Sequence, residues 1–191
     1  MELLKQRILK DGAIKGESIL KVDSFLNHQI DVNLLREIAL EFHRRFGQKN
    51  ITKVLTIESS GIAIGAFVAD VFGVSLVFAK KRHSANLGDD VYTVPVASFT
   101  HGCTYDVTVA KEFLQEGDGL LIVDDFLARG CALRGLLEMA AQAKAEVLGI
   151  GIVIEKGFQG GGDQLRREGL PLESLAVLDS LTPLVFRENV E

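Results

Sequence analysis

The chain has 191 residues, which is enough for one compact domain with a sizeable core. Apolar residues make up 47% of it and charged residues 25%, a balance that is typical of globular proteins and excludes a disordered chain. The net charge is -5, so the chain is not built to neutralise a phosphate backbone, and we expect no nucleic-acid partner.

The chain carries no targeting or membrane signal that we can identify. The first residues lack the basic flank and the long apolar stretch of a signal peptide, and no apolar run is long enough to cross a bilayer. The spacing of Cys103 and Cys131 is not that of a metal site or a disulfide framework. The sequence therefore predicts a cytoplasmic protein without a membrane partner.

The first part of the chain predicts two helices. Apolar residues recur at helical spacing over residues 1–9, and this helix should stop at Asp11 and Gly12. A second helix should begin after Asp31, which is a good N-cap, and end with Gly47 at its C′ position. One face of the second helix is apolar and carries Leu34, Leu35, Ile38, Phe42 and Phe46.

The pattern changes after residue 50, where strands and helices begin to alternate. The predicted strands cover residues 53–57, 74–79, 120–123 and 147–154, and the predicted helices cover 62–71 and 133–143. The uninterrupted apolar run 120–123 is typical of a strand in the middle of a parallel sheet. The repeated order of strand, turn, helix and strand predicts a doubly wound α/β core.

Two features lie outside this repeat. Residues 92–99 and 104–110 predict two antiparallel strands that are joined by Thr100, His101 and Gly102. Residues 160–162 are three consecutive glycines and predict a loop.

Two adjacent carboxylates, Asp124 and Asp125, follow the apolar run 120–123, and a turn of mostly small residues, Ala128–Ala132, then opens a predicted helix. In open parallel sheets, ligands bind beyond the carboxyl ends of the strands. Small side chains leave the backbone N–H groups of such a turn accessible, and these groups form an anion site together with the helix dipole.

This segment allows two interpretations. In the first, the acids only cap the following helix. In the second, carboxylates beside a phosphate cradle bind a ligand that has both hydroxyl groups and a phosphate, such as a ribose 5-phosphate. A dinucleotide site of the Rossmann type is disfavoured, because no Gly-x-Gly-x-x-Gly follows the early strands.

The same segment resembles the motif by which type I phosphoribosyltransferases bind 5-phosphoribosyl 1-pyrophosphate (PRPP): an apolar strand, two acids, two mostly apolar residues and a five-residue phosphate loop. Residues 21–31, 56–61 and 149–159 are similar to segments of the bacterial xanthine phosphoribosyltransferases. The resemblance implies purine salvage, in which the 5-phosphoribosyl group of PRPP is transferred to xanthine to give xanthosine 5'-monophosphate and pyrophosphate.

The resemblance also implies the fold. We expect an α/β structure of the type I phosphoribosyltransferase fold, in which helices flank a mainly parallel central sheet. Residues 1–191 would form a single domain. Elements from about residues 1–30 and 155–191 would form a small hood over the base. The family match further implies a homodimer.

In the family, the two acids orient the ribose and favour the positive charge that develops on it, and this role would fall to Asp124 and Asp125. The phosphate loop would hold the 5-phosphate with Ala128, Arg129, Gly130, Cys131 and Ala132. Two of these residues depart from the usual pattern: related loops more often carry a short polar residue in place of Arg129, and Ala132 lacks a hydroxyl group that many members use.

The turn Glu58-Ser59-Ser60 matches the pyrophosphate loop of the family, although a serine N-cap would be its ordinary interpretation. The cationic run around Lys81 would be a solvated surface in most proteins. In this family the corresponding loop closes over PRPP, and Lys81 would contact pyrophosphate oxygens. A Mg²⁺ ion would bind mainly through substrate oxygens and water, so we assign no metal ligand in the protein.

The xanthine base would be bound by Asn27, Lys156 and the backbone near Leu20. The ammonium of Lys156 offers only donors and favours an oxo group, whereas a flipped Asn27 amide could also accept a hydrogen bond from guanine. Without the family match, the ordinary interpretation of Lys156 is a solvent-exposed lysine at a strand end, and that of Asn27 is a turn residue before a helix. Hypoxanthine-guanine relatives have an acid where this chain has Ala128, so the group that moves the imidazole proton is not identified.

Two alternative functions follow from these features. The first is the same reaction with guanine or hypoxanthine as the base. The second is a regulator without catalysis that senses PRPP, which is disfavoured because the chain is acidic and has little room for a DNA-binding domain.

Overall fold

The computed structural model describes residues 1–16, 19–81, 90–98 and 103–188. Its centre is a six-stranded sheet in the order β10-β9-β8-β7-β3-β4. The five strands from β9 to β4 pair in parallel, and β10 joins the edge antiparallel to β9. The strands of this sheet are β3 (Lys53–Ile57), β4 (Ser75–Ala79), β7 (Gly119–Leu127), β8 (Glu146–Lys156), β9 (Leu172–Leu181) and β10 (Leu184–Phe186).

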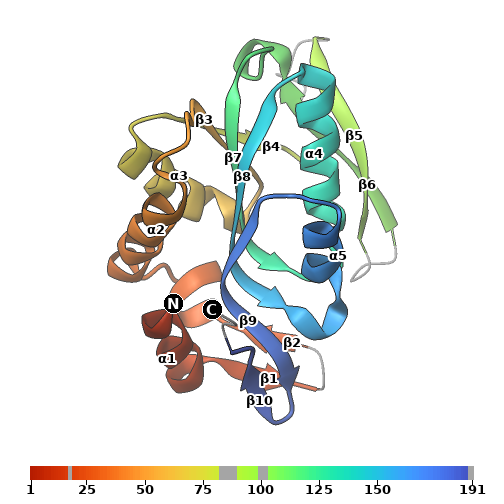
Figure 1. Cartoon of the computed structure of the whole chain (residues 1–191). Coiled ribbons are helices and arrows are strands. Elements are labelled where there is room, and N and C mark those ends of the chain that lie inside the picture. Colours follow the sequence, from red (N-terminus) through yellow and green to blue (C-terminus); the bar gives the residue numbers. More distant parts are fainter. Residues whose placement is uncertain (17–18, 82–89, 99–102, 189–191) are drawn as a thin grey trace.

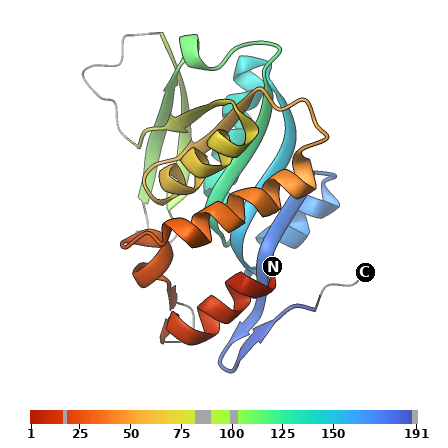
Figure 2. The same cartoon turned by 90° about the vertical axis from the view of Figure 1, so that its left-hand side faces the viewer.

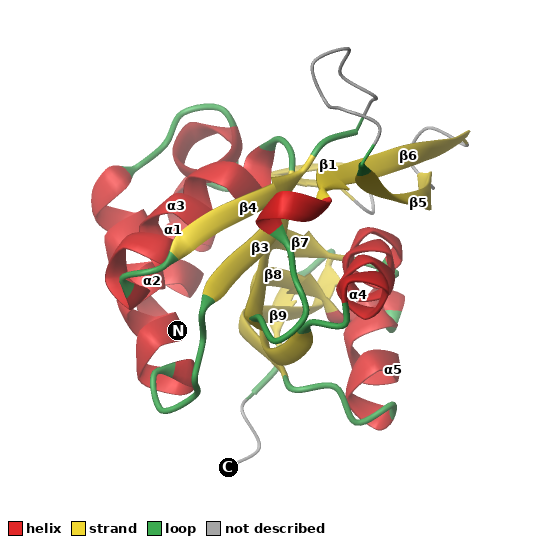
Figure 3. Ribbon diagram, turned by 90° about the horizontal axis from the view of Figure 1, so that it is seen from above, coloured by secondary structure: helices red, strands yellow, loops and turns green. Residues whose placement is uncertain are grey.

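Helices cover both faces of the sheet. Figures 1 and 3 show α2 and α3 on one face and α4 and α5 on the other. The helices are α1 (Glu2–Asp11), α2 (Val32–Phe46), α3 (Ser60–Phe72), α4 (Cys131–Ala143) and α5 (Gly161–Arg167). The α/β fold with a mainly parallel sheet between helices is therefore confirmed.

Each face of the sheet has its own hydrophobic core. Fully buried Phe42 of α2 and Ile64 of α3 pack against the first face. Leu136 and Met139 of α4 pack against the second, together with the inward valines of a separate two-stranded sheet. That sheet consists of β5 (Val91–Ser98) and β6 (Cys103–Ala110), which pair antiparallel as the sequence predicts. The connection predicted at Thr100, His101 and Gly102 lies outside the described residues.

The boundaries of α2 illustrate how the sequence sets an element. The carboxylate of Asp31 accepts hydrogen bonds from the backbone N–H groups of Asn33 and Leu34, both at 3.1 Å, so the predicted N-cap is confirmed. Gly47 directly follows the helix as predicted, and it has a right-handed conformation, with φ of -63°, where many helices end in a left-handed glycine. Its N–H still donates to the carbonyl of His43, so the helix closes without a left-handed residue.

Two other predictions need correction. β7 extends through Leu127, so Asp124 and Asp125 lie within the strand and not in a turn behind it. Pairing of β7 with β8 as far as Leu127 stabilises this extension. Of the three glycines 160–162, only Gly160 takes a left-handed conformation, with φ of 75°, and the other two form the first turn of α5 instead of a loop.

Short elements from the two ends of the chain lie together. Figures 1 and 2 place α1, β1, β2 and β10 at the lower end of the molecule, toward which the carboxyl ends of β7 and β8 point. The N-terminal ammonium donates to the carbonyl of Leu175 at 2.6 Å and so ties α1 to β9. The short elements are β1 (Ala13–Lys15), β2 (Ile19–Lys21), the π-helical turn η1 (Asp23–Asn27) and the 3₁₀ turns η2 (Lys111–Phe113) and η3 (Gly157–Gln159).

Within the described ranges, no helix combines the length and the apolar character that a membrane crossing requires.

Candidate functional site

The candidate site lies at the carboxyl ends of β3, β7 and β8. These three strands are neighbours in the sheet and run parallel, so the segments that follow them meet at one edge. β3 leads into the turn at Glu58, β7 into the loop at Ala128, and β8 ends at Lys156. Three segments that are distant in the sequence are thereby brought together.

Two cavities open at this edge. The larger, of about 430 Å³, is lined by Asp124, by the whole loop from Ala128 to Ala132 and by Lys156. The smaller, of about 150 Å³, is lined by both carboxylates and by the turn that follows β3. Asp124, Ala132 and Tyr105 border both cavities, so the two form one continuous site.

Asp124 is a buried carboxyl group at the junction of the two cavities. Its side chain is 7% exposed, and burial raises its pKa well above the ordinary carboxyl value, with the charge of Asp125 acting in the same direction. The backbone N–H of Asp125 donates to Asp124 Oδ1 at 3.0 Å. A Cβ on Gly61 would lie 3.3 Å from Asp124 Oδ1 and would overlap the hydroxyl of Thr56, so glycine permits this close approach. The arrangement presents two carboxylates side by side, one of them shielded from water.

The loop from Ala128 to Ala132 has the geometry of an anion site. Gly130 has φ of 84°, a left-handed conformation that favours glycine, and α4 begins at the next residue. Cys131 and Ala132 therefore belong to the first turn of α4, where the N–H groups have no acceptor within the helix. These N–H groups and the positive end of the helix dipole suit a phosphate group. The Arg129 side chain is exposed at the rim of the loop.

The turn after β3 borders the smaller cavity. The Glu58–Ser59 peptide bond is cis, and α3 begins at Ser60. The backbone N–H of Lys81 donates to the Glu58 carboxylate at 2.6 Å, which links this turn to the end of β4. The Lys81 ammonium lies 5.6 Å from the centre of the Tyr105 ring. Carboxylate, hydroxyl and ammonium groups thus surround this cavity, while the loop at 82–89 that we expect to close over it lies outside the described residues.

Of the three residues expected to bind the base, only Lys156 lines the larger cavity. The Lys156 ammonium lies 5.5 Å from the centre of the Phe126 ring, and burial lowers its pKa although the charge of Asp125 opposes this. The Leu20 side chain is 5% exposed and belongs to the core, while its neighbour Ile19 lines the cavity. Asn27 does not line the cavity, but its side-chain oxygen is buried and finds no hydrogen-bond partner among the described residues.

Sequence reasoning missed eight residues that line the larger cavity, of which four bear on the base side or on the motifs. Tyr105 reaches it from β6, which is remote from the motif in the sequence, and Ile19 comes from a short strand that the pattern does not predict. Phe126 and Gln159 lie close to the motifs at Asp125 and Lys156. Their proximity to those motifs was the only signal that could have found them.

Comparisons with known proteins agree with this geometry. The family model of the phosphoribosyl transferase domain matches residues 21–165. The xanthine phosphoribosyltransferase of Lachnoclostridium phytofermentans is 56% identical and covers 98% of each chain. The xanthine phosphoribosyltransferase of Oceanobacillus iheyensis is 50% identical over 100% of this chain and 98% of its own.

Solved structures show the same fold. The APRTase of Giardia lamblia, solved with 9-deazaadenine, superimposes with a TM-score of 0.76 at 23% identity and covers 91% of this chain and 96% of its own. The adenine phosphoribosyltransferase of Rhodothermus marinus gives a TM-score of 0.73 at 24% identity, with 93% and 97% covered. By its fold, its family model and its full-length relatives, the chain belongs to the phosphoribosyl transferase family and, within it, to the xanthine phosphoribosyltransferases.

Proposed function

We propose that the protein is an enzyme of purine salvage that transfers the 5-phosphoribosyl group from PRPP to xanthine and releases pyrophosphate. The observation that carries this proposal is the continuous site, whose lining combines an anion cradle, two carboxylates and a lysine. A ribose 5-phosphate with a base at C1 needs these three kinds of group. The relatives that are 50–56% identical over nearly the whole chain are named xanthine phosphoribosyltransferases, which supports this reaction.

The two carboxylates would act on the ribose. When a nitrogen of the base replaces pyrophosphate at C1, positive charge develops on the sugar ring. Asp124 and Asp125 would accept hydrogen bonds from the ribose hydroxyls, which orients the ring, and would stabilise that charge. Because Asp124 is buried, its contribution is weakly screened by solvent.

The phosphate groups would bind on the two sides of this pair. The backbone of the loop with Ala128, Arg129, Gly130, Cys131 and Ala132 would bind the 5-phosphate at the start of α4. Pyrophosphate would leave through the smaller cavity, where Glu58, Ser59, Ser60 and Lys81 lie. The Lys81 ammonium would neutralise part of its charge.

The base would lie at the end of the larger cavity near Lys156. Xanthine has carbonyl oxygens at C2 and C6, and an ammonium can only donate to them. Within the part of the chain that the structure describes, the buried Asn27 oxygen has no hydrogen-bond partner, so a movement of η1 on binding would bring a polar group of the base or a water to it. Ile19 already borders the cavity, which supports a contact from the backbone near Leu20.

We also propose that Mg²⁺ accompanies PRPP. No group of three or more potential metal-binding side chains gathers among the described residues. Two carboxylates beside a phosphate site nevertheless fit Mg²⁺, because this ion keeps several waters and binds through one or two carboxylates and substrate oxygens. When bound, it would neutralise charge on the pyrophosphate.

The test is a nucleotide-forming assay with PRPP and Mg²⁺ that compares xanthine, guanine, hypoxanthine and adenine as the base. We expect the highest kcat/KM with xanthine. A higher value with guanine or hypoxanthine would favour the first alternative. Binding of PRPP without nucleotide formation from any of the four bases would favour a sensor of PRPP.

Three further features complete the proposal. The chain would form one domain whose hood comes from about residues 1–30 and 155–191, since α1, β1, β2 and β10 of these segments lie at the end of the molecule that the site faces. It would act in the cytoplasm. It would form a homodimer, which light scattering across working concentrations would test, and a monomer throughout would contradict this part.

A further inference from the structure

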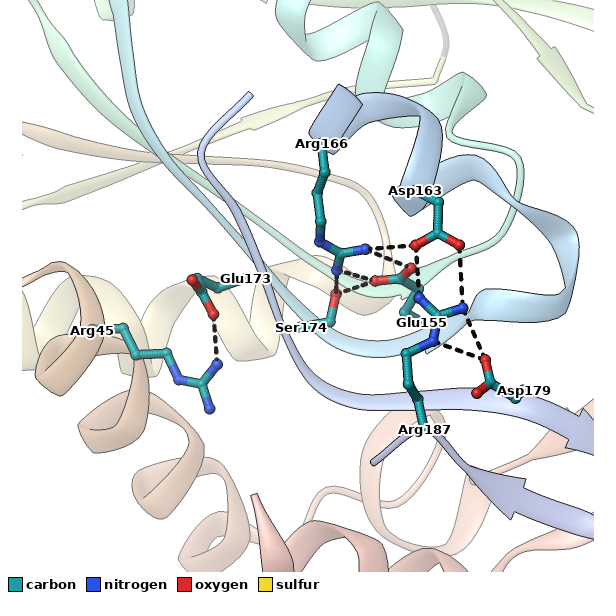
Figure 4. A network of polar contacts seen from close by, with 8 residues as sticks. All are labelled: Arg45, Glu155, Asp163, Arg166, Glu173, Ser174, Asp179 and Arg187. Carbon is teal, nitrogen blue, oxygen red and sulfur yellow. Dashed lines mark hydrogen bonds and ion pairs between the residues drawn. The ribbon is translucent and has the colours of Figure 1, made fainter. Parts of the chain in front are cut away.

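An ion pair with a buried carboxylate lies directly behind the candidate site. Glu155 is 0% exposed and precedes Lys156 in β8. Arg166 of α5 donates to both of its carboxylate oxygens, at 2.5 and 3.0 Å, and the hydroxyl of Ser174 on β9 donates at 2.5 Å (Figure 4). Adjacent side chains of a strand point to opposite faces, so Glu155 faces α5 while Lys156 faces the cavity.

The network extends to the last described segment of the chain. Arg187 donates to both oxygens of Asp163 in α5, at 2.6 and 3.2 Å, and to Asp179 of β9 at 2.9 Å. A Cβ on Gly157, the residue after Lys156, would lie 2.8 Å from the Arg187 guanidinium. The turn behind Lys156 therefore packs against the network as well.

The first turn of α5 contacts both the network and the phosphate loop. A Cβ on Gly162 would overlap the Glu155 carboxylate. A Cβ on Gly161 would overlap the carbonyl oxygen of Ala128 and would lie 2.9 Å from Cα of Arg129. Two adjacent glycines thus allow α5 to lie against the buried carboxylate and the phosphate loop at once.

We propose that the Glu155–Arg166 pair and the glycine turn of α5 are positioning elements that fix the distance between the phosphate loop and Lys156. This inference rests on the proposed function, because it assigns the network to the two ends of the same substrate site. The pair anchors α5, Gly161 transmits the position of α5 to Ala128, and β8 transmits it to Lys156. Glu155, Arg166 and Gly161 contact no substrate in this scheme and act only through these neighbours.

The first test uses Gly161→Ala and Glu155→Gln. The methyl group of Gly161→Ala must displace the phosphate loop, so we expect the Kd for Mg²⁺·PRPP, measured by calorimetry, to rise on the order of tenfold or more. Glu155→Gln retains an acceptor but loses the charge that holds Arg166, so KM for PRPP and for xanthine should both rise, with Glu155→Ala more affected than Glu155→Gln.

A control variant is available on the neighbouring strand, β9. Glu173 precedes Ser174 in β9 and pairs with Arg45 of α2 at 2.9 Å, away from α5 (Figure 4). Glu173→Gln also removes one carboxylate from an ion pair, and it should leave Kd and both KM values unchanged. Thermal melting of every variant separates lost folding from lost positioning.

Two results would overturn the proposal. One is wild-type affinity for Mg²⁺·PRPP in folded Gly161→Ala. The other is Glu155→Gln with a lower melting temperature but wild-type KM values, which would make the pair purely structural. The proposed function is tested separately, because nucleotide formation by the wild-type chain decides it, whereas the calorimetric comparison needs no turnover.

Discussion

At the scale of single residues, the ionised form of Asp124 that the reaction would use is also the form that destabilises the folded chain. Burial, and then the neighbouring charge of Asp125, raise its pKa above the ordinary carboxyl value of 3.8. A proton on Asp124 therefore favours the folded chain. This stabilisation is complete below the ordinary value and is lost as the pH rises through the raised folded pKa. At neutral pH, ionisation of Asp124 therefore lowers the free energy of unfolding.

We therefore predict that Asp124→Asn melts at a higher temperature than the wild type at pH 7 and that this difference shrinks toward pH 4, because the amide cannot ionise. The same variant and Asp125→Asn should lose about 100-fold in kcat, which corresponds to a lost electrostatic contact of about 3 kcal/mol. Asp70→Asn, at the exposed end of α3, is the control and should change neither the melting temperature nor kcat. Near-normal turnover in both site variants would reduce the pair to a structural role.

A second prediction at this scale concerns the choice of base. Lys156→Met keeps much of the side-chain length but removes the donors, so the ratio of kcat/KM for xanthine over guanine should fall by about 10-fold, the effect of one hydrogen bond to a charged group. Asn27→Ala should lower the ratio less, since an amide can also serve guanine. If both variants keep the wild-type ratio, other residues select the base.

At the scale of elements, the sequence predicts those parts whose signals are local. The N-cap at Asp31 and the alternation of strands and helices from residue 53 to 156 are visible in the residue pattern, and the structure confirms them. The helix predicted over residues 1–9 is present as α1. The strands β1, β2, β9 and β10 were not predicted. Their order depends on contacts between remote segments, such as the N-terminal ammonium with the carbonyl of Leu175, and a local window cannot register these contacts.

Gly130 tests how far the start of α4 depends on one backbone conformation. An alanine at φ of 84° is strained, so Gly130→Ala should lower the free energy of unfolding by about 1–2 kcal/mol. It should also weaken PRPP binding, because the strain turns the first N–H groups of α4 away from the phosphate. Gly117→Ala has nearly the same φ, 89°, with open space around it, so it should lose similar stability and keep its PRPP affinity. Equal losses of affinity in both variants would contradict a local role for the loop.

At the scale of the whole molecule, the two halves of the site differ in how well the sequence predicts them. The structure brings Asp124, Asp125 and the phosphate loop to one cavity system because consecutive residues of one strand and turn carry them. The base side combines β2, β6 and η3, which converge only when the complete sheet has formed. Tyr105 was missed for this reason, and Asn27 lies apart from the cavity.

The rise in melting temperature on ligand binding tests the carboxylate pair, the phosphate loop and the metal together. A ligand that binds only the folded chain raises the free energy of unfolding by about 2.7 kcal/mol at 100 times its Kd, so PRPP with Mg²⁺ should raise the melting temperature by about 5–10 °C for a chain of this size. The carboxylate pair and the phosphate loop would share one charged ligand, and its pyrophosphate needs the metal for neutralisation. EDTA should therefore abolish most of the shift, and ATP with Mg²⁺ should give a much smaller one. An equal shift by PRPP in EDTA would show that the chain binds the nucleotide precursor without the metal.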